Sequence, residues 1–375
     1  MPLRLIDGNE AIAWGAHFAG CRFYAGYPIT PATSIFNTML RILPAHGGTV
    51  IQAEDEIAAF GYCIGASMAG LKAMTATSGP GLSLYSEQIS FAIGSEIPLV
   101  VVDVQRLGPS TGSATKGADG DIQFMRWGSS GGQPVIVLSP VDVADCFRLT
   151  MEGFNLAERY RCPVFIASNK EVGQTRESID LERLAWPEVE DRRRAASGGE
   201  YLPFRLERLD GAPAFLPIGG ETLVRQTSST HGEDGYITTD PEEIHRMQEH
   251  RRRKIEDHAD ELSLVEPYGS KEADVVILTY GVTARAAYEA FAQCQAEGKS
   301  VSLLVLKTLW PVPERRIKEH IGQKGRILVV EMNQGQYVRE VERIAKDRGV
   351  RFLGRMDGEL ISPKEIKEHI DDWIA

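Results

Sequence analysis

Cysteine is scarce in this sequence and widely scattered. The chain has no Cys-x-x-Cys pair, and its five cysteines are Cys21, Cys63, Cys146, Cys162 and Cys294. This spacing argues against a zinc site or an iron-sulfur cluster held by the chain itself, and no metal site is predicted. An odd number of cysteines in apolar segments predicts reduced thiols, as in a cytoplasmic protein.

Long apolar stretches and an excess of positive charge are also missing. No segment offers the roughly 20 apolar residues that a membrane span needs, and the N-terminus lacks a cleavage site, so we expect neither membrane insertion nor export. The 41 basic and 52 acidic residues give a net charge of -11, which repels nucleic acid. The one basic run, residues 250–254, is followed by four acids, and such a mixed run predicts a solvent-facing side of a helix.

What the sequence does contain is enough residues for more than one buried core, with 375 in total. Helical and extended patterns alternate with short turns over residues 1–170, which predicts a parallel sheet covered by helices. Residues 171–271 are rich in charge, proline and glycine, and we expect an extended polar connection that wraps over the surface or meets a partner, with a helix near 241–262. The alternation resumes over residues 272–375 and predicts a second, smaller α/β domain.

Ligands of open parallel sheets bind outside the carboxyl ends of the strands, so the loops after the predicted strands are the first place to look for a site. The loop Tyr27-Pro28-Ile29-Thr30-Pro31 follows a predicted strand at 22–26. Its two prolines stiffen a turn that presents one threonine hydroxyl. A rigid strand-to-helix connection explains the same residues equally simply.

A second loop carries three acids, Glu54, Asp55 and Glu56, at the start of a predicted helix over 55–69. Acids in a first helical turn complement the helix dipole. Glu56 is followed by Ile57-Ala58-Ala59-Phe60, so burial of this helix would place its carboxyl in apolar surroundings, raise its pKa and let it act as an acid. Glu54, two residues earlier, is the rival candidate.

The third loop, residues 105–117, follows an apolar run at 98–104 that suits a strand buried on both faces. It combines Arg106 with glycines, hydroxyls and Lys116, a combination that can hold a planar carboxylate. The alternative is a surface arginine in a flexible loop.

Several familiar motifs are missing. The Ser-Gly-Pro-Gly turn at 78–81 lacks the spacing and lysine of a Walker loop, and the chain has no GxGxxG after a strand, no GxSxG and no HExxH. Residues 117–121, Gly-Ala-Asp-Gly-Asp, lack the order and the following asparagines of a thiamine diphosphate metal motif.

Taken together and in this order, the loops resemble the alpha subunit of 2-oxoacid:ferredoxin oxidoreductases, which are thiamine diphosphate enzymes. Almost the whole chain takes part. The matching segments are residues 7–11, YPITP at 27–31, residues 54–70, TSGPG at 77–81, QRLGPSTGSATK at 105–116, KTLWPVP at 307–313 and VEMN at 330–333. Each segment is weak alone, but the co-linear set is highly specific.

The resemblance implies a fold and a set of site residues. It implies a pyrimidine-type thiamine diphosphate-binding domain at 1–170 and a transketolase C-terminal-like α/β domain at 272–375. Glu56 is implied as the catalytic acid, against the N1′ atom of the aminopyrimidine. Contacts with the cofactor are implied for Tyr27, Pro28, Ile29 and Glu56. Contacts with the substrate are implied for Thr30, Arg106, Thr115 and Lys116, and residues 230–235 resemble a family loop that can approach the substrate.

The resemblance also implies an activity that this chain performs only with partners. That activity is the oxidative decarboxylation of 2-oxoglutarate with coenzyme A to succinyl-CoA, CO2 and reduced ferredoxin. A beta subunit is expected to supply the diphosphate site, Mg²⁺ and a [4Fe-4S] cluster. A gamma subunit, a ferredoxin-like delta subunit and a second alpha copy would complete the hetero-oligomer, with ferredoxin as its acceptor.

Three alternatives stay open at this point. The nearest is an oxidoreductase for the branched-chain substrate 2-oxoisovalerate, with the same architecture. A non-oxidative thiamine decarboxylase is a second, and the iron content of the purified complex distinguishes it. A non-catalytic α/β scaffold subunit is the third, in which Glu56 and Arg106 are merely structural.

Overall fold

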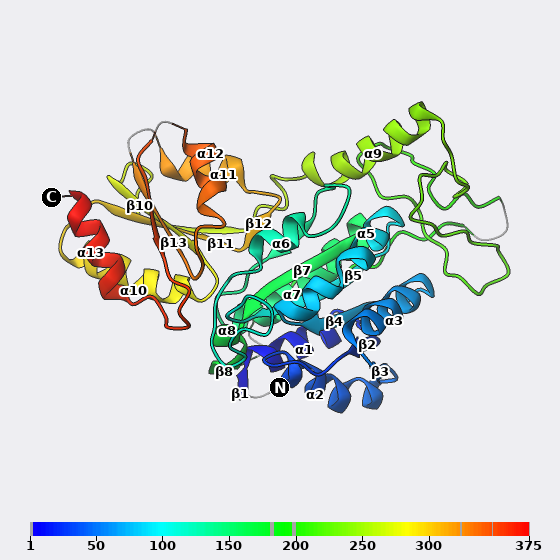
Figure 1. Ribbon diagram of the computed structural model, residues 1–375, viewed down its shortest axis with the longest axis horizontal. Coiled ribbons are helices and arrows are strands. Elements are labelled where there is room, and N and C mark those ends of the chain that lie inside the picture. Colours follow the sequence, from blue (N-terminus) through cyan, green and yellow to red (C-terminus); the bar gives the residue numbers. More distant parts are fainter. Residues whose placement is uncertain (1–2, 181–183, 197–199, 323–324, 347, 375) are drawn as a thin grey trace.

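The computed structural model describes residues 3–180, 184–196, 200–322, 325–346 and 348–374. Two separate sheets, one built mainly from each half of the chain, lie side by side with helices around them (Figure 1). A short antiparallel pair, β1 (Arg4–Asp7) with β8 (Arg176–Ile179), lies beside the first sheet near the N-terminus. The alternation of helix and strand expected from the sequence is present in both halves.

The first sheet has seven strands, all parallel except one at its edge. In spatial order they are β12 (Thr308–Trp310), β6 (Ile136–Leu138), β7 (Pro163–Asn169), β5 (Leu99–Gln105), β4 (Ala73–Thr77), β2 (Phe23–Gly26) and β3 (Thr49–Gln52). The antiparallel edge strand β12 comes from the far half of the chain. Sequence reasoning placed its residues with the second domain and did not predict this strand.

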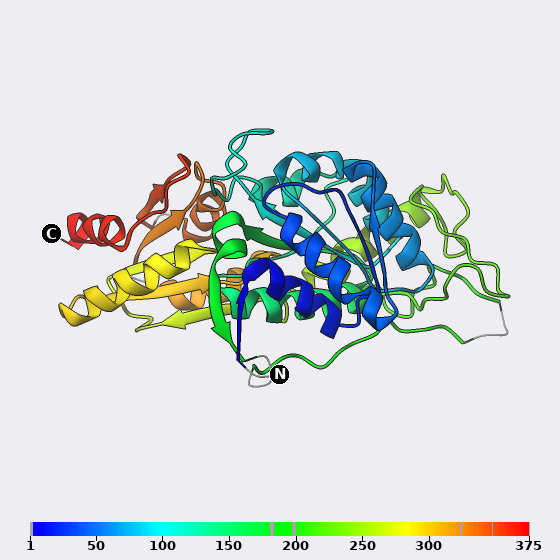
Figure 2. The ribbon, with the colours of Figure 1, turned by 90° about the horizontal axis from the view of Figure 1, so that it is seen from below.

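Helices cover both faces of the first sheet (Figure 2). One face is covered by α1 (Gly8–Phe18), α2 (Thr33–Ile42) and α7 (Val143–Tyr160). The other is covered by α3 (Glu56–Met68), α4 (Gly79–Leu84), α5 (Ser86–Gly94) and α6 (Ile122–Trp127). Successive side chains of a strand point to opposite faces, so Val100 and Val102 pack under α1 and α7 while Leu99 and Val101 face α5. By the same alternation, Asp103 points to the face that carries α3 to α6.

The second sheet has five strands. In order they are β14 (Val350–Gly354), β13 (Arg326–Glu331), β10 (Val275–Tyr280), β11 (Val301–Leu306) and the antiparallel β9 (Val265–Tyr268). The helices on its two faces are α10 (Thr283–Ala296) with α13 (Pro363–Ile374), and α11 (Glu314–Ile321) with α12 (Val338–Ala345). The fully buried Val275, Val276 and Ile277 explain why this strand reads as a continuous apolar run.

The segment predicted as an extended polar connection is irregular over much of its length. Its regular elements are α8 (Lys170–Gln174), β8, α9 (Pro241–Glu256) and β9, while the short 3-10 turn η1 (Pro44–His46) lies outside it. In Figure 1, α9 and the irregular stretch before it extend well beyond the first sheet. Residues 181–183 and 197–199 of this segment lie outside the described residues, and its boundaries stay a prediction.

The prediction that residues 250–254 form a solvent-facing side of a helix was wrong for three of the five residues, since only Arg252 and Arg253 reach the surface. His250 and Lys254 share one face of α9, as residues i and i+4 do, and both are buried together with Arg251. The Nζ atom of Lys254 lies 2.5 Å and His250 Nε2 3.1 Å from Glu96 Oε2 at the end of α5. Burial alone would raise the pKa of Glu96, but Lys254 and His250 together hold it well below its ordinary value. The basic residues therefore fasten α9 to the first sheet through one buried acid.

Candidate active site

Four segments meet at the carboxyl edge of the first sheet, because parallel strands all end there. They are the loops after β2, β4 and β5, and the start of α3 after β3. The buried Asn9 of α1 fixes the first of these loops, since its Nδ2 donates to the Pro31 carbonyl at 2.9 Å and to Ser34 Oγ at 2.8 Å. This edge contains the residues that the sequence singled out.

Glu56 is the first residue of α3, and its carboxyl is turned inward. Asp55 caps the helix by accepting a hydrogen bond from the Ala58 amide at 2.7 Å, which leaves Glu56 free for another role. The Glu56 side chain is 8% exposed, whereas Glu54 lies on the surface. Within the part of the chain that the structure describes, no group donates a hydrogen bond to the Glu56 carboxyl. Its oxygens are not among the fully buried polar atoms that lack a partner, so water can reach them, and a ligand donor can take the place of that water.

The TSGPG turn provides the wall against which Glu56 lies. A Cβ atom on Gly81 would fall 2.1 Å from Thr77 Oγ1, 2.7 Å from Glu56 Cγ and 2.9 Å from Glu56 Oε1. Only glycine therefore allows α4 to approach Glu56 this closely.

Replacing Gly81 by alanine is expected to destabilise the protein by about 1 to 3 kcal/mol, because the added methyl group overpacks the contact with Thr77 and Glu56. The melting temperature of the purified protein measures this. Gly65 is the matched control, since no described heavy atom lies within 4 Å of a Cβ built there. Gly65→Ala, on an exposed helical position, is expected to stabilise by up to about 1 kcal/mol. Equal stability of Gly81→Ala and the wild-type protein would contradict the close contact.

Arg106 and Thr30 lie together at this edge. The Arg106 side chain is 6% exposed and its Nη1 donates to the backbone carbonyl of Thr30 at 2.6 Å. The Thr30 side chain is exposed. Arg106 is therefore a buried cation held by the loop after β2, and not a surface arginine in a flexible loop.

Lys116 and Thr115 stand at the far end of the loop that begins at Arg106. The Leu107 amide donates to the Lys116 carbonyl at 2.8 Å, so the two ends of the loop meet. The Lys116 side chain, however, reaches the second half of the chain, where Nζ lies 2.6 Å from Glu359 Oε1. Thr115 and Tyr27 are exposed, while Pro28 and Ile29 are half-buried. The structure brings Arg106 and Thr30 into contact and directs Lys116 toward Glu359.

Residues 230–235 do not reach this edge within the chain. His231 is buried, with Nε2 2.9 Å from the Arg251 guanidinium, and its ring packs on Phe204 with centroids 3.8 Å apart. Ser228, just before it, lies against Gly94 at the end of α5. Since α5 leads into the start of β5, this segment lies at the amino edge of the sheet, opposite Glu56.

Sequence reasoning missed Asp103 in β5, and it considered Asp119 and Asp121 of the following loop only as a metal motif that they do not match. Asp103 and Asp119 are buried, and Asn169 Nδ2 donates to Asp119 Oδ1 at 2.7 Å. Burial raises the pKa of Asp119 to about 7 and that of Asp121 to about 6. An aspartate inside the apolar run at 99–105 was the available signal, because an acid in a strand buried on both faces needs a reason.

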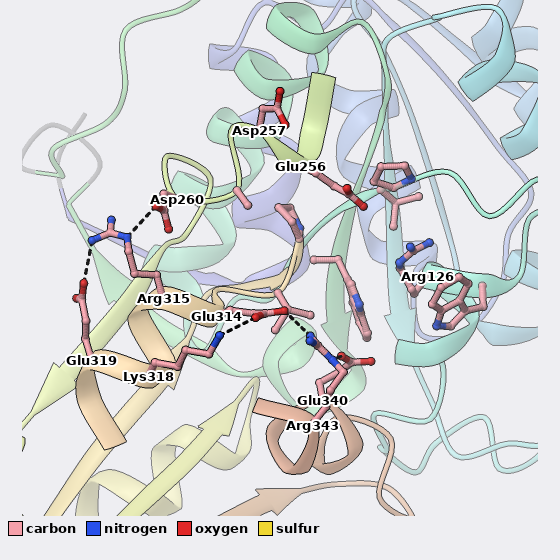
Figure 3. Close-up of a pocket in the computed structure, with 17 residues that line it drawn as sticks. Arg126, Glu256, Asp257, Asp260, Glu314, Arg315, Lys318, Glu319, Glu340 and Arg343 are labelled. Carbon is pink, nitrogen blue, oxygen red and sulfur yellow. Dashed lines mark hydrogen bonds and ion pairs between the residues drawn. The ribbon is translucent and has the colours of Figure 1, made fainter. Parts of the chain in front are cut away.

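A cavity of about 930 Å³ lies away from this edge, between α6, the end of α9 and the helices α11 and α12 (Figure 3). Most of its charged side chains pair with one another or with a charged neighbour. Arg315 contacts Asp260 at 2.8 Å, and Lys318 and Arg343 contact Glu314 at 3.1 and 2.6 Å. Because these charges are already engaged, the cavity is not the candidate site.

Comparison with known families identifies the class. The family model described as pyruvate flavodoxin/ferredoxin oxidoreductase, thiamine diphosphate-binding, matches residues 14–250, and that of pyruvate:ferredoxin oxidoreductase core domain II matches residues 273–366. The chain therefore belongs to the pyruvate flavodoxin/ferredoxin oxidoreductase family. This confirms the predicted α/β fold class with its thiamine diphosphate-binding first domain. Among the described helices, none is both long enough and apolar enough to cross a membrane.

Individual members of the family are similar to this chain over nearly its full length. The 2-oxoglutarate synthase subunit KorA of Methanothermobacter marburgensis is 41% identical over 97% of both chains. The ketoisovalerate oxidoreductase subunit VorB of Methanothermobacter thermautotrophicus is 34% identical over 99% of this chain and 97% of its own. A solved 2-oxoglutarate:ferredoxin oxidoreductase from Magnetococcus marinus, with 2-oxoglutarate, coenzyme A and succinyl-CoA bound, matches all of this chain with a TM-score of 0.91 and 33% identity. This chain spans 65% of that longer one.

The residues at the carboxyl edge fit a thiamine ring. The aminopyrimidine of the cofactor needs a carboxyl that is not already engaged, and Glu56 is buried without a donor among the described residues. The glycine at position 81 leaves room beside it.

Proposed function

We propose that this chain is the alpha-type subunit of a 2-oxoglutarate:ferredoxin oxidoreductase, which converts 2-oxoglutarate and coenzyme A to succinyl-CoA and CO2 while reducing ferredoxin. The observation that carries the proposal is that two groups lie at the same edge of the sheet. They are Glu56, an acid that accepts no hydrogen bond from the described residues, and Arg106, a buried cation. Full-length similarity to 2-oxoglutarate synthase subunits supports the same choice.

Glu56 is the proton-holding group in this proposal. Bound thiamine diphosphate supplies the electron sink that decarboxylation of a 2-oxoacid requires. Glu56 would hold a proton at the N1′ atom of the aminopyrimidine, and Gly81 fixes where its carboxyl lies. Tyr27, Pro28 and Ile29, in the loop after β2, would line the cofactor site.

The substrate is held by charge. The guanidinium of Arg106 presents donors in a planar fork that suits the carboxylate lost as CO2, and the hydroxyls of Thr30 and Thr115 would complete that part of the pocket. Lys116 would hold the distal carboxylate of a five-carbon diacid. That carboxylate would replace Glu359, whose negative charge occupies Lys116 in the free chain.

Partner subunits complete the site. A beta subunit would bring the diphosphate site, Mg²⁺ and a [4Fe-4S] cluster, with gamma and delta subunits, a second alpha copy and ferredoxin around it. The outer face of α3, next to Glu56, exposes Ile57 and Tyr62 and leaves Gly65 in open space, which suits close docking by another chain. The five cysteines are buried free thiols, which supports a cytoplasmic location.

Turnover by the complete complex tests the proposal. We expect coenzyme A-dependent reduction of an acceptor with 2-oxoglutarate and much weaker reduction with 2-oxoisovalerate. Lys116→Gln should raise KM for 2-oxoglutarate about tenfold, since one charged hydrogen bond is lost, and leave KM for 2-oxoisovalerate unchanged. Activity with 2-oxoisovalerate alone would favour the branched-chain alternative instead. Decarboxylation in a complex without iron would indicate a non-oxidative enzyme.

A further inference from the structure

Two acids at the end of β5 face each other, and the proposed function uses neither. Asp103 is fully buried in β5. Asp121 ends the loop that begins at Arg106, and its backbone amide donates to Gln105 Oε1 at 3.0 Å. The loop therefore returns to the strand that it left. Asp103 pairs with Thr77 of β4, and the Asp121 carboxyl packs on Gly79, two residues beyond Thr77, so the two carboxyls lie close together.

Neither carboxyl has an ordinary hydrogen-bond donor. Both side-chain oxygens of Asp103 and the Oδ2 of Asp121 are buried without a partner among the described residues. Two ionised carboxylates in this position would repel each other and lack donors. One proton shared by the pair removes both penalties, because protonated Asp103 then donates to ionised Asp121.

The Asp103–Asp121 pair is close to both parts of the candidate site, which are Glu56 with Gly81 on one side and Arg106 on the other. A Cβ atom on Gly79 would fall 2.8 Å from Asp121 Oδ2, so this carboxyl packs on the start of α4, the helix that holds Gly81 against Glu56. On the other side, the positive charge of Arg106 lowers the pKa of both acids, although burial outweighs it. The Nε of Arg106 is buried and has no partner among the described residues.

We propose that Asp103 is a positioning residue for Arg106, because it carries the proton that leaves a single negative charge on the pair. With two negative charges, the guanidinium would be drawn from the Thr30 carbonyl toward the acids. If both acids were protonated, the buried Arg106 guanidinium would lack a counterion. Arg106 holds the substrate carboxylate in the proposed function, and the role of Asp103 rests on that assignment.

The pKa values of the two acids define the pH range over which the Asp103–Asp121 pair carries one proton. Burial and then Asp121 raise the pKa of Asp103 well above its ordinary value, while that of Asp121 is raised by burial to about 6. The other groups that face the pair are Asp119, with Glu331 behind it, and Arg106. The one-proton state therefore extends from about pH 6 up to the pKa of Asp103. Since the folded pKa of Asp103 is raised, its contribution to stability is present at lower pH and is lost as pH rises through that value.

Two substitutions in the complete complex test the role of Asp103. Asp103→Asn keeps a donor to Asp121 but has no proton to lose, so the alkaline fall in kcat/KM for 2-oxoglutarate is expected to disappear. Asp103→Leu keeps the branched shape with the same number of side-chain heavy atoms, although it is bulkier, and removes the donor, and kcat/KM is expected to fall about tenfold or more. Asp119→Asn is the graded comparison: the charge of Asp119 helps to raise the pKa of Asp103, so this variant is expected to keep the alkaline limb but shift it to lower pH.

Infrared spectroscopy of the same complexes gives a readout that needs no turnover. At a pH above about 7, where Asp119 is ionised, and below the alkaline fall in kcat/KM, the wild-type complex should show a protonated carboxyl band that Asp103→Asn lacks. Identical alkaline limbs in the wild-type and Asp103→Asn complexes, or an unchanged band, would overturn the proposal. A wild-type complex that is inactive with 2-oxoglutarate contradicts the proposed function instead, and the band still shows whether Asp103 carries the proton.

Discussion

Replacing Glu56 by glutamine is expected to lower kcat by about 10² to 10⁴-fold, the usual contribution of a positioned proton-transfer group. The glutamine amide has nearly the same shape, so the contact with Gly81 and the start of α3 should be retained. The measurement is acceptor reduction by the complete complex at saturating 2-oxoglutarate and thiamine diphosphate. Cofactor content and subunit composition are measured on the same preparation.

Glu54 provides the control for this experiment. It lies two residues earlier in the same acidic run but on the surface, so Glu54→Gln is expected to leave kcat unchanged. If Glu56→Gln turned over at the wild-type rate with cofactor and partners bound, the carboxyl would have no acid role and a scaffold function would become the better account.

Replacing Arg106 by alanine should lower kcat/KM for 2-oxoglutarate about 30-fold or more, because losing a buried, hydrogen-bonded charge costs about 2 to 5 kcal/mol. The buried guanidinium donates to the Thr30 carbonyl, and the variant loses both that contact and the proposed substrate contact. Initial rates at low substrate concentration give kcat/KM directly. Arg106→Lys keeps the charge without the planar fork, and an intermediate loss is expected.

The matched arginine is Arg126, which is half-buried in the cavity of Figure 3 with its guanidinium 3.7 Å from the Trp127 ring centroid. Arg126→Ala removes a comparable side chain whose described contacts are Trp127 and the Gln133 carbonyl rather than any proposed site residue, so kcat/KM should not change. Equal losses in the two variants would show that Arg106 acts through the stability of the fold rather than through the substrate.

Much of the site could be predicted because the relevant signals are local. A parallel sheet brings the ends of β2, β3, β4 and β5 to one edge, so loops that are distant in sequence meet there. The choice of Glu56 over Glu54 came from the family resemblance and from the spacing to Gly65-Ala66, and the structure turns Glu56 inward and leaves Glu54 on the surface. Its exact partners in the assembly cannot be read from one chain, and the roles of the site residues stay predictions.

Other features could not be predicted because they depend on contacts between distant segments. The run at 250–254 looked solvated in sequence, yet two of its residues, His250 and Lys254, contact Glu96, an acid some 150 positions away. No local sequence pattern predicts that contact. Asp103 was hidden for a related reason, since an apolar run predicts burial but does not say which acid inside it will meet Asp121.

The edge strand β12 has a consequence for how the polypeptide can be divided. It pairs with β6, whose residues 136–138 are fully apolar and buried, and it is made some 170 residues after them. A shortened version that ends before residue 307 would leave the backbone amides and carbonyls of β6 open to any other extended peptide. Such fragments should self-associate. During synthesis, β12 can pair with β6 only after most of the protein has been made.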